Sequence, residues 1–264
     1  MLSPAATVRG PGTKKLLGAV NFNVRFHEAC RQAKELIRAP EFGGVQFIHG
    51  SYLQEFHLLP ADQGWRYDAE LGGRMRAVTE IGSHWIDLAR YWSGLEVEAV
   101  SAAFGCFNQD RRLDGGLMYA PTHKSGKAIR VESEDAASVT LRFSNGALGH
   151  ILLSEVSPGR SNAISIEASG AQSAVWWHSE DPYRLNHSAG KFNGYHTTVQ
   201  AFSGGFPDTF AAFFDRVYDA LQSGFDADVH ADYPTFEDGY RNAAVCDAIY
   251  RSAQNSSMWV KISR

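Results

Sequence analysis

The feature that most constrains the fold is a regular alternation of apolar and polar residues in the middle of the chain. Apolar residues alternate with polar ones over residues 137–143, and a second run covers 148–156. Asn145-Gly146 separates the two runs, and this dipeptide between alternating segments is the strongest short signal for a β-hairpin. The pattern returns in two further runs around Gly170, Ala163–Ala168 and Ala174–His178. These runs predict antiparallel strands with one covered face and one exposed or shared face.

Periodicity elsewhere predicts helices and further strands. The expected helices are Phe26–Arg38, a segment from Val78 to about Ser93, Thr209–Gln222, and one from Thr235 to about Ser252. The expected strands are Leu16–Arg25, Val45–Tyr52, Val97–Phe107 and Met258–Ile262. Asp208 and the Thr235/Asp238 pair are predicted to cap helices, Gly94 to end one, and residues 109–125 and 178–205 to be irregular. The chain is therefore predicted to be α+β, with an open, predominantly antiparallel or mixed sheet and helices packed on one face.

Composition excludes several classes of protein. The 264 residues carry a formal net charge of −4, which argues against a nucleic-acid-binding protein with its basic stripe. Three well-separated cysteines predict no disulfide framework and favour a reducing compartment. No apolar run approaches the roughly 20 residues of a membrane span. A cytoplasmic protein is expected, with residues 1–16 as a disordered or poorly packed leader and residues 17–264 as the folded domain.

Three well-known motifs are absent. The chain has no G-x-G-x-x-G after a strand and no G-x-x-x-x-G-K-[ST], so the turn that cradles a dinucleotide pyrophosphate is not predicted. It also lacks a G-x-S-x-G nucleophile elbow, which leaves hydrolase chemistry without support.

The predicted helix beginning at Val78 carries the strongest candidate chemistry. Glu80 and His84 are four residues apart, and His84 and Asp87 are three apart, which places each pair on one helical face. A carboxylate beside an imidazole can transfer protons near neutral pH. A structural ion pair has the same spacing and is the commoner use of such a pair. A metal site built from the three residues is a weaker alternative, because no HExxH motif and no paired cysteines accompany them.

The long connection between Leu53 and Arg76 is the second candidate. It contains Gln54, Trp65 and Arg66, and arginine beside aromatic residues suits a sugar or a phosphate. Trp65 could equally fill the core beneath the loop.

Six segments, in order, resemble one family. They are AVNFNVRF at 19–26, GGVQFIHGSYLQ at 43–54, WR at 65–66, ELGG at 70–73, EIGSHWIDLA at 80–89 and PTFEDGYRNAAVCDAI at 234–249. From about residue 17 onward the chain resembles the C-terminal substrate domain of the glucose–fructose oxidoreductase/inositol dehydrogenase (Gfo/Idh/MocA) family. The resemblance implies oxidation of a sugar or cyclitol hydroxyl with hydride transfer to NAD or NADP. It also implies a homodimer or higher oligomer formed through the open sheet.

The resemblance assigns roles to residues. The family motif D-x-G-x-H-x-x-D implies that His84 transfers the hydroxyl proton, with Glu80 in place of the usual aspartate and Asp87 as the second motif acid. The remaining residues implied to line the sugar and nicotinamide pocket are Arg25, Gln54, Trp65 and Arg66, with Tyr195 or His196. The family's N-terminal Rossmann domain, with the lysine of its E-K-P motif, is expected to be missing. The alternative is a non-catalytic sugar-binding or dimerisation module, and a metal-dependent lyase or isomerase is a third reading.

Overall fold

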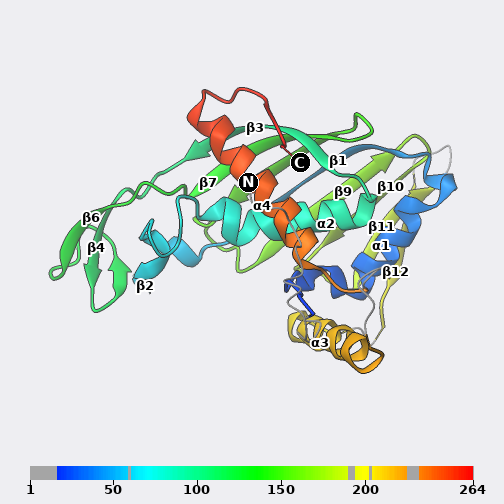
Figure 1. The fold of residues 1–264 in the computed structure, drawn as a ribbon, viewed down its shortest axis with the longest axis horizontal. Coiled ribbons are helices and arrows are strands. Elements are labelled where there is room, and N and C mark those ends of the chain that lie inside the picture. The colour runs from blue at the N-terminus through cyan, green and yellow to red at the C-terminus, as the bar shows by residue number, and fades with distance from the viewer. Residues whose placement is uncertain (1–16, 59–60, 190–193, 202–203, 225–231, 264) are drawn as a thin grey trace, which may run out of the picture.

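The computed structural model describes residues 17–58, 61–189, 194–201, 204–224 and 232–263, so the leader predicted at 1–16 lies outside the described residues. A nine-stranded sheet in the order β12-β11-β10-β9-β1-β8-β7-β3-β13 forms its centre (Figure 1). Strand β1 runs parallel to β8, and the other pairs in this sheet are antiparallel. The predicted mixed, mainly antiparallel sheet is confirmed. The strands are β1 Val45–Leu53, β3 Val97–Gly105, β7 Ala136–Phe143, β8 Leu148–Ser154, β9 Ala163–Gly170, β10 Ser173–His178, β11 Arg184–Ala189, β12 His196–Val199 and β13 Val260–Lys261.

The hairpin predicted around Asn145-Gly146 is confirmed. Gly146 has a φ of 86°, a left-handed conformation that glycine adopts without a steric penalty, and β7 and β8 pair on either side of it. Val139, Leu141 and Phe143 are fully buried, whereas Ser138 and Arg142, which point to the other face of the strand, are exposed. The alternation in sequence therefore separates a covered face from an open one.

Helices α1 Glu28–Arg38, α2 Ser83–Ser93 and α4 Phe236–Gln254 lie across one face of the sheet (Figure 1). Their apolar residues join those of the strands in one core, which includes the fully buried Trp85 and Trp92 of α2. On the opposite face Phe47, Leu148 and Leu152 remain 38%, 47% and 45% exposed. This arrangement confirms the predicted α+β fold with helices on one face.

The strand predicted at Leu16–Arg25 is wrong. Its described residues form an isolated bridge between Ala19 and Thr235, followed by a 3₁₀ turn, η1, over Asn23–Phe26. Asn23 Nδ2 donates to Thr209 Oγ1 over 2.8 Å, and Arg25 turns toward Asp87. Polar residues recur in this segment because Asn23 and Arg25 bind side chains of helices. The segment has no neighbouring strand in the described structure.

The two segments predicted to be irregular contain strands, so those predictions are also wrong. A second sheet, β2-β5-β4-β6, takes two of its strands, β4 and β5, from residues 109–125, and β11 and β12 lie within 178–205. Its strands are β2 Ala61–Gln63, β4 Asp110–Asp114, β5 Leu117–Tyr119 and β6 Lys127–Arg130. The strands of this sheet are three to five residues long and carry many polar side chains, so they lack the apolar alternation by which strands are recognised.

Helix ends were predicted with mixed success. Helix α4 begins as predicted, with a capping box in which Asp238 N donates to Thr235 Oγ1 and Thr235 N donates to the Asp238 carboxylate. Helix α3 spans Phe206–Gln222 and begins three residues earlier than predicted, with Gly205 rather than Asp208 as its N-cap. Short 3₁₀ turns complete the elements: η2 Pro40–Phe42, η3 Phe56–Leu58 and η4 Gly64–Tyr67.

The helix predicted from Val78 is one continuous element of two kinds. A π-helical turn, η5, covers Val78–Gly82, and α2 continues it to Ser93, where Gly94 ends it with a φ of 71°. A π turn holds more residues than an α turn, so side chains four residues apart no longer lie directly above one another. None of the helices in the described part of the chain combines the length and the apolar character needed to cross a bilayer.

Candidate active site

Glu80 lies on η5 and is held by an arginine of the preceding loop. Arg66 Nε, on η4, donates to Glu80 Oε2 over 3.0 Å. The Arg66 guanidinium also stacks over the Trp65 ring at 4.6 Å, and both side chains donate to Gln63 Oε1. Trp65 is 49% exposed, so it does not fill the core. The loop between Leu53 and Arg76 therefore presents a cation and an aromatic face beside the carboxylate.

His84 follows one turn later but does not pair with Glu80. Its ring packs edge-on against Phe22 with the centroids 5.8 Å apart. The Nδ1 atom is buried without a hydrogen-bond partner in the described structure. Burial, which disfavours the charged ring, lowers the pKa of His84 to about 4. The imidazole is therefore neutral at physiological pH, and its Nδ1 is not engaged by another group of the described structure.

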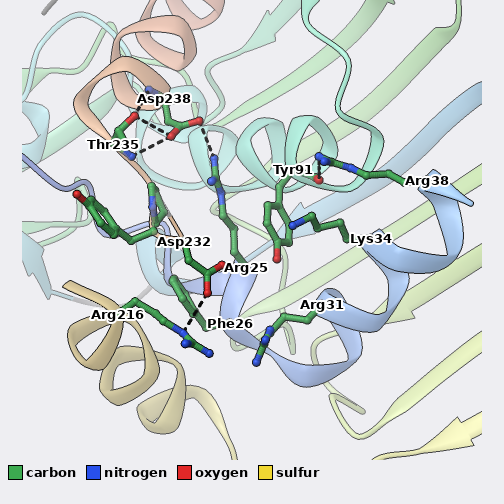
Figure 2. Close-up of a pocket in the computed structure, with 12 residues that line it drawn as sticks. Arg25, Phe26, Arg31, Lys34, Arg38, Tyr91, Arg216, Asp232, Thr235 and Asp238 are labelled. Carbon is green, nitrogen blue, oxygen red and sulfur yellow. Dashed lines mark hydrogen bonds and ion pairs between the residues drawn. The ribbon is translucent and has the colours of Figure 1, made fainter. Parts of the chain in front are cut away.

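Asp87 is engaged elsewhere. It is almost completely buried and accepts a two-pronged contact from Arg25, with Nε to Oδ2 at 2.6 Å. Arg25 Nη2 also reaches Asp238 Oδ1 at 3.2 Å (Figure 2). Burial alone would lower the pKa of Arg25, but the two carboxylates outweigh it and raise that pKa above the ordinary value. This geometry makes Asp87 a structural anchor for Arg25 and not a partner of His84.

Gln54 is buried at the end of β1. Its Nε2 donates to Asn162 Oδ1 over 2.7 Å, and the Tyr52 hydroxyl donates to the same oxygen over 2.6 Å. The Gln54 backbone is held by hydrogen bonds with Ser154 and Ser157. It therefore lies near the ends of β1 and β8, from which the loop carrying Trp65 and Arg66 departs.

Tyr195 and His196 lie on a different part of the molecule. Tyr195 packs against Trp176 at 5.1 Å, and Trp176 points away from the face on which the neighbouring Trp177 contacts His27 at the start of α1. His196 belongs to β12, the edge strand, and packs against His187 at 5.5 Å. Among the described residues, no contact joins either side chain to Glu80, His84 or Arg66. Their role in the same pocket stays a prediction.

A buried ionic cluster beneath Glu80 was not foreseen. His57 Nε2 lies 3.4 Å from Glu155 Oε2 and 4.0 Å from Glu80 Oε2, and His57 Nδ1 lies 2.7 Å from the Tyr67 hydroxyl. Arg76, which is completely buried, donates to Glu155 over 2.8 Å and to Asp135. Burial raises the pKa of Glu155 to about 7, although His57 and Arg76 oppose the rise. The carboxylate–imidazole pair expected on the helix is therefore formed with a histidine of the preceding loop.

Comparison with known proteins identifies the family. The family model described as the GFO/IDH/MocA C-terminal domain matches residues 30–175. This chain belongs to the GFO/IDH/MocA family. The match includes Gln54, Glu80, His84 and Asp87, so the motif at residues 80–87 lies within the domain that defines the family.

Individual GFO/IDH/MocA proteins extend the comparison. Levoglucosan dehydrogenase of Pseudarthrobacter phenanthrenivorans is 27% identical over 271 residues, covering 94% of this chain and 67% of the relative. A levoglucosan dehydrogenase structure in complex with NADH and levoglucosan is 26% identical, with a TM-score of 0.80 over 94% of this chain and 66% of that one. An oxidoreductase domain protein from Kribbella flavida, 24% identical over 93% of this chain and 66% of that one, has the same fold with a TM-score of 0.81. The chain thus spans about two thirds of the length of these GFO/IDH/MocA relatives.

One group of side chains in this family member has the ligand types of a metal site. His57, Glu80 and Glu155 each place one ligand atom within 4.8 Å of the others. Arg66 and Arg76 already donate to the two carboxylates, so the positive charge that a cation would supply is present. His84 and Asp87, the other two residues of the metal reading made from sequence, are not in this group.

Proposed function

We propose that this chain is the substrate-binding part, residues 17–264, of an oxidoreductase that acts on a sugar or cyclitol hydroxyl with NAD or NADP. The observation that supports this most is the state of His84. Its ring is neutral at physiological pH, it has no protein hydrogen bond in the described structure, and it occupies the histidine position of the family motif.

His84 is assigned the hydroxyl proton. Oxidation of an alcohol to a carbonyl removes a proton from oxygen and a hydride from carbon, and a neutral imidazole can take the proton. Glu80 is assigned the second contact to the hydroxyl, since Arg66 holds its carboxylate in place. Glutamate is one methylene longer than the usual aspartate, and the Arg66 contact fixes the position of the longer side chain.

Arg66, Trp65 and Gln54 are assigned to the ring of the substrate. An exposed indole offers a flat apolar face for the C–H side of a sugar, and the amide and guanidinium groups offer donors for its hydroxyls. Arg25 and Asp87 form an ion pair, and we assign this pair to holding α2 in position.

The described residues do not fit the diphosphate of a dinucleotide. Such a group binds at a glycine-rich turn between a strand and a helix N-terminus, and the sequence has no G-x-G-x-x-G. The hydride acceptor is therefore given no contacts in this chain, and only the proton is assigned to its residues. NAD or NADP remains a proposal based on family membership and on the relatives solved with NADH.

The alternative is a sugar-binding or dimerisation module without activity. The open face of the nine-stranded sheet carries Phe47, Leu148 and Leu152, all more than one-third exposed. Apolar side chains gathered on an uncovered sheet face favour association. Pairing of two copies through this face, in the cytoplasm, is part of the proposal under either reading.

Saturation-transfer NMR with levoglucosan, L-sorbose and myo-inositol tests the proposal on the chain itself. We expect at least one of these to bind, His84→Ala to weaken binding about tenfold, and His150→Ala on the open sheet face to leave it unchanged. Absence of binding, or equal binding by both variants, would contradict the assigned site. A parallel fluorescence titration with NADH and NADPH tests whether the chain contacts a nicotinamide cofactor despite the missing G-x-G-x-x-G. Saturable binding would favour the oxidoreductase over the module without activity.

A further inference from the structure

A cavity lies between α1, the end of α2, α3 and residues 232–235, which directly precede α4. Its volume is about 450 Å³, which is large enough for a small organic molecule. Tyr91 forms part of its wall, and Arg25 lies at its inner side, where it pairs with Asp238 (Figure 2). Asp87, which does not line the cavity, holds Arg25 from behind. None of Glu80, His84, Trp65 or Arg66 lines it. The cavity is therefore distinct from the candidate active site.

One face of α1 supplies three cations to this cavity. Arg31, Lys34 and Arg38 follow at spacings of three and four residues, which align side chains along one side of a helix. Arg38 donates to the backbone oxygens of Tyr91 and Trp92, at the negative end of α2. Among the described residues, backbone dipoles alone balance its charge.

Lys34 has no carboxylate within ion-pair distance in the described structure. Its ammonium lies 4.8 Å from the centre of the Tyr91 ring, so it is held over the wall of the cavity by a cation–π contact. Arg31 has only Glu28 at 3.5 Å, and both side chains are about half exposed. Water and salt screen such a pair strongly, so it neutralises little of the positive field in the cavity.

The opposite wall adds Arg216, so that five cations including Arg25 line the cavity. Its two acids, Asp232 and Asp238, each have a cationic partner, and the Arg216–Asp232 pair is largely exposed and therefore screened. Arg216 of α3 pairs with Asp232 at 3.3 Å. Asp238 accepts from Arg25 and from Thr235 in the capping box of α4. The concave surface therefore retains positive charge from Lys34, Arg31 and Arg38 that no lining carboxylate contacts, and a concave site concentrates such a field.

We infer that this cavity binds the phosphate group of a small phosphorylated ligand. Several cations that converge from two helices suit an oxyanion with three or more acceptor oxygens, and lysine is a common point-charge partner of phosphate. The volume of the cavity leaves room for the molecule that carries the phosphate. The inference does not depend on the proposed function, since neither Lys34 nor Arg31 takes part in it.

Isothermal titration calorimetry of the chain with inorganic phosphate, in low-salt buffer, tests the inference. We expect saturable binding that chloride at the same ionic strength does not reproduce. The double variant Lys34→Gln/Arg31→Gln should weaken it about tenfold or more, which corresponds to the loss of about 1.4 kcal/mol. Lys127→Gln, an exposed lysine on β6 of the small sheet, is the matched control and should bind as the parent does.

The two possible sources of the phosphate are separated by two further titrations. Glucose 6-phosphate represents a phosphorylated sugar, and ADP represents a nucleotide. Tighter binding of either than of inorganic phosphate supports the inference and names the class. Absence of saturable phosphate binding, or equal binding by the double variant and the parent with both folded by circular dichroism, would overturn it. Sugar binding at His84 is measured separately, so failure of one site leaves the other intact.

Discussion

Arg25 and Arg76 are each held by two carboxylates, yet the two networks differ in how completely they are satisfied. Arg25 is 12% exposed and joins Asp87 of α2 to Asp238 of α4. Arg76 is completely buried between Asp135 and Glu155, with its guanidinium 4.5 Å from the centre of the Tyr67 ring. Around Arg76 three buried atoms lack partners in the described structure, namely Arg76 Nη1, Glu155 Oε1 and Glu134 Oε2. No such atom belongs to Arg25, Asp87 or Asp238.

The Arg25 network is therefore a fully paired structural contact, whereas the Arg76 network is a polar cluster with unpaired buried atoms. Fully paired charges add rigidity, whereas unpartnered buried polar atoms cost free energy and persist where something else requires them. The Arg76 cluster contacts Glu80 through His57, and it contains two carboxyls, Glu134 and Glu155, whose pKa burial raises to about 7. The incompletely satisfied network therefore lies beneath the candidate active site.

The largest expected effect comes from Arg76→Met. It leaves Asp135 and Glu155 buried without their shared cation, which costs about 3–5 kcal/mol for a buried pair broken on one side. Urea denaturation followed by circular dichroism measures the free energy of unfolding. Arg130→Met, on the exposed β6 strand, is the control and should change it by less than about 0.5 kcal/mol. A loss below about 1 kcal/mol for Arg76→Met would mean that the cluster is solvated.

Asp87→Asn should cost less, about 2–3 kcal/mol, because Arg25 keeps Asp238 as a partner and is partly solvated. The same denaturation experiment gives the value. If Asp87→Asn proved more damaging than Arg76→Met, the contrast between the two networks would be reversed.

The pH dependence of stability tests Glu155 directly. Its pKa is about 7 in the folded chain against 4.5 as the ordinary value, so the folded state binds more protons between these values and stability falls as pH rises from 4.5 to 7. Glu155→Gln should remove the part of this loss of stability that comes from Glu155, which is on the order of 2 kcal/mol. Denaturation of parent and variant at pH 5 and pH 8 measures the difference. A parallel pH dependence in both proteins would show that Glu155 titrates normally.

The smallest effect is expected from Thr235→Ala, which removes half of the capping box of α4 and costs about 1 kcal/mol. Asp238 also accepts a hydrogen bond from Arg25, so this variant tests whether the helix cap and the Arg25 network are energetically coupled. In a double-mutant cycle with Asp87→Asn, we expect an interaction energy above about 0.5 kcal/mol. If the two free-energy changes simply add, the capping contact and the Arg25 contact of Asp238 are independent.

The sequence by itself determined the elements whose pattern is local. The β7–β8 hairpin follows from alternation around Asn145-Gly146, the start of α4 follows from Thr235 and Asp238, and the end of α2 follows from Gly94. The short motifs also identified the family, because several motifs in the right order are specific where a single motif is not. For the hairpin and the two helix ends, the residues that specify the structure lie within a few positions of one another.

Tertiary structure decided what depends on distant partners. Arg25 meets Asp87 across 62 residues and Asp238 across 213, and these contacts replace the strand predicted for its segment by the turn η1. The π turn at η5 directs Glu80 to Arg66 and His57 instead of His84, and no residue type in that segment marks it. The polar strands β11 and β12, the last two at one end of the sheet, form because a neighbouring strand offers backbone partners. Local periodicity carries no information about such neighbours, since they come from elsewhere in the chain.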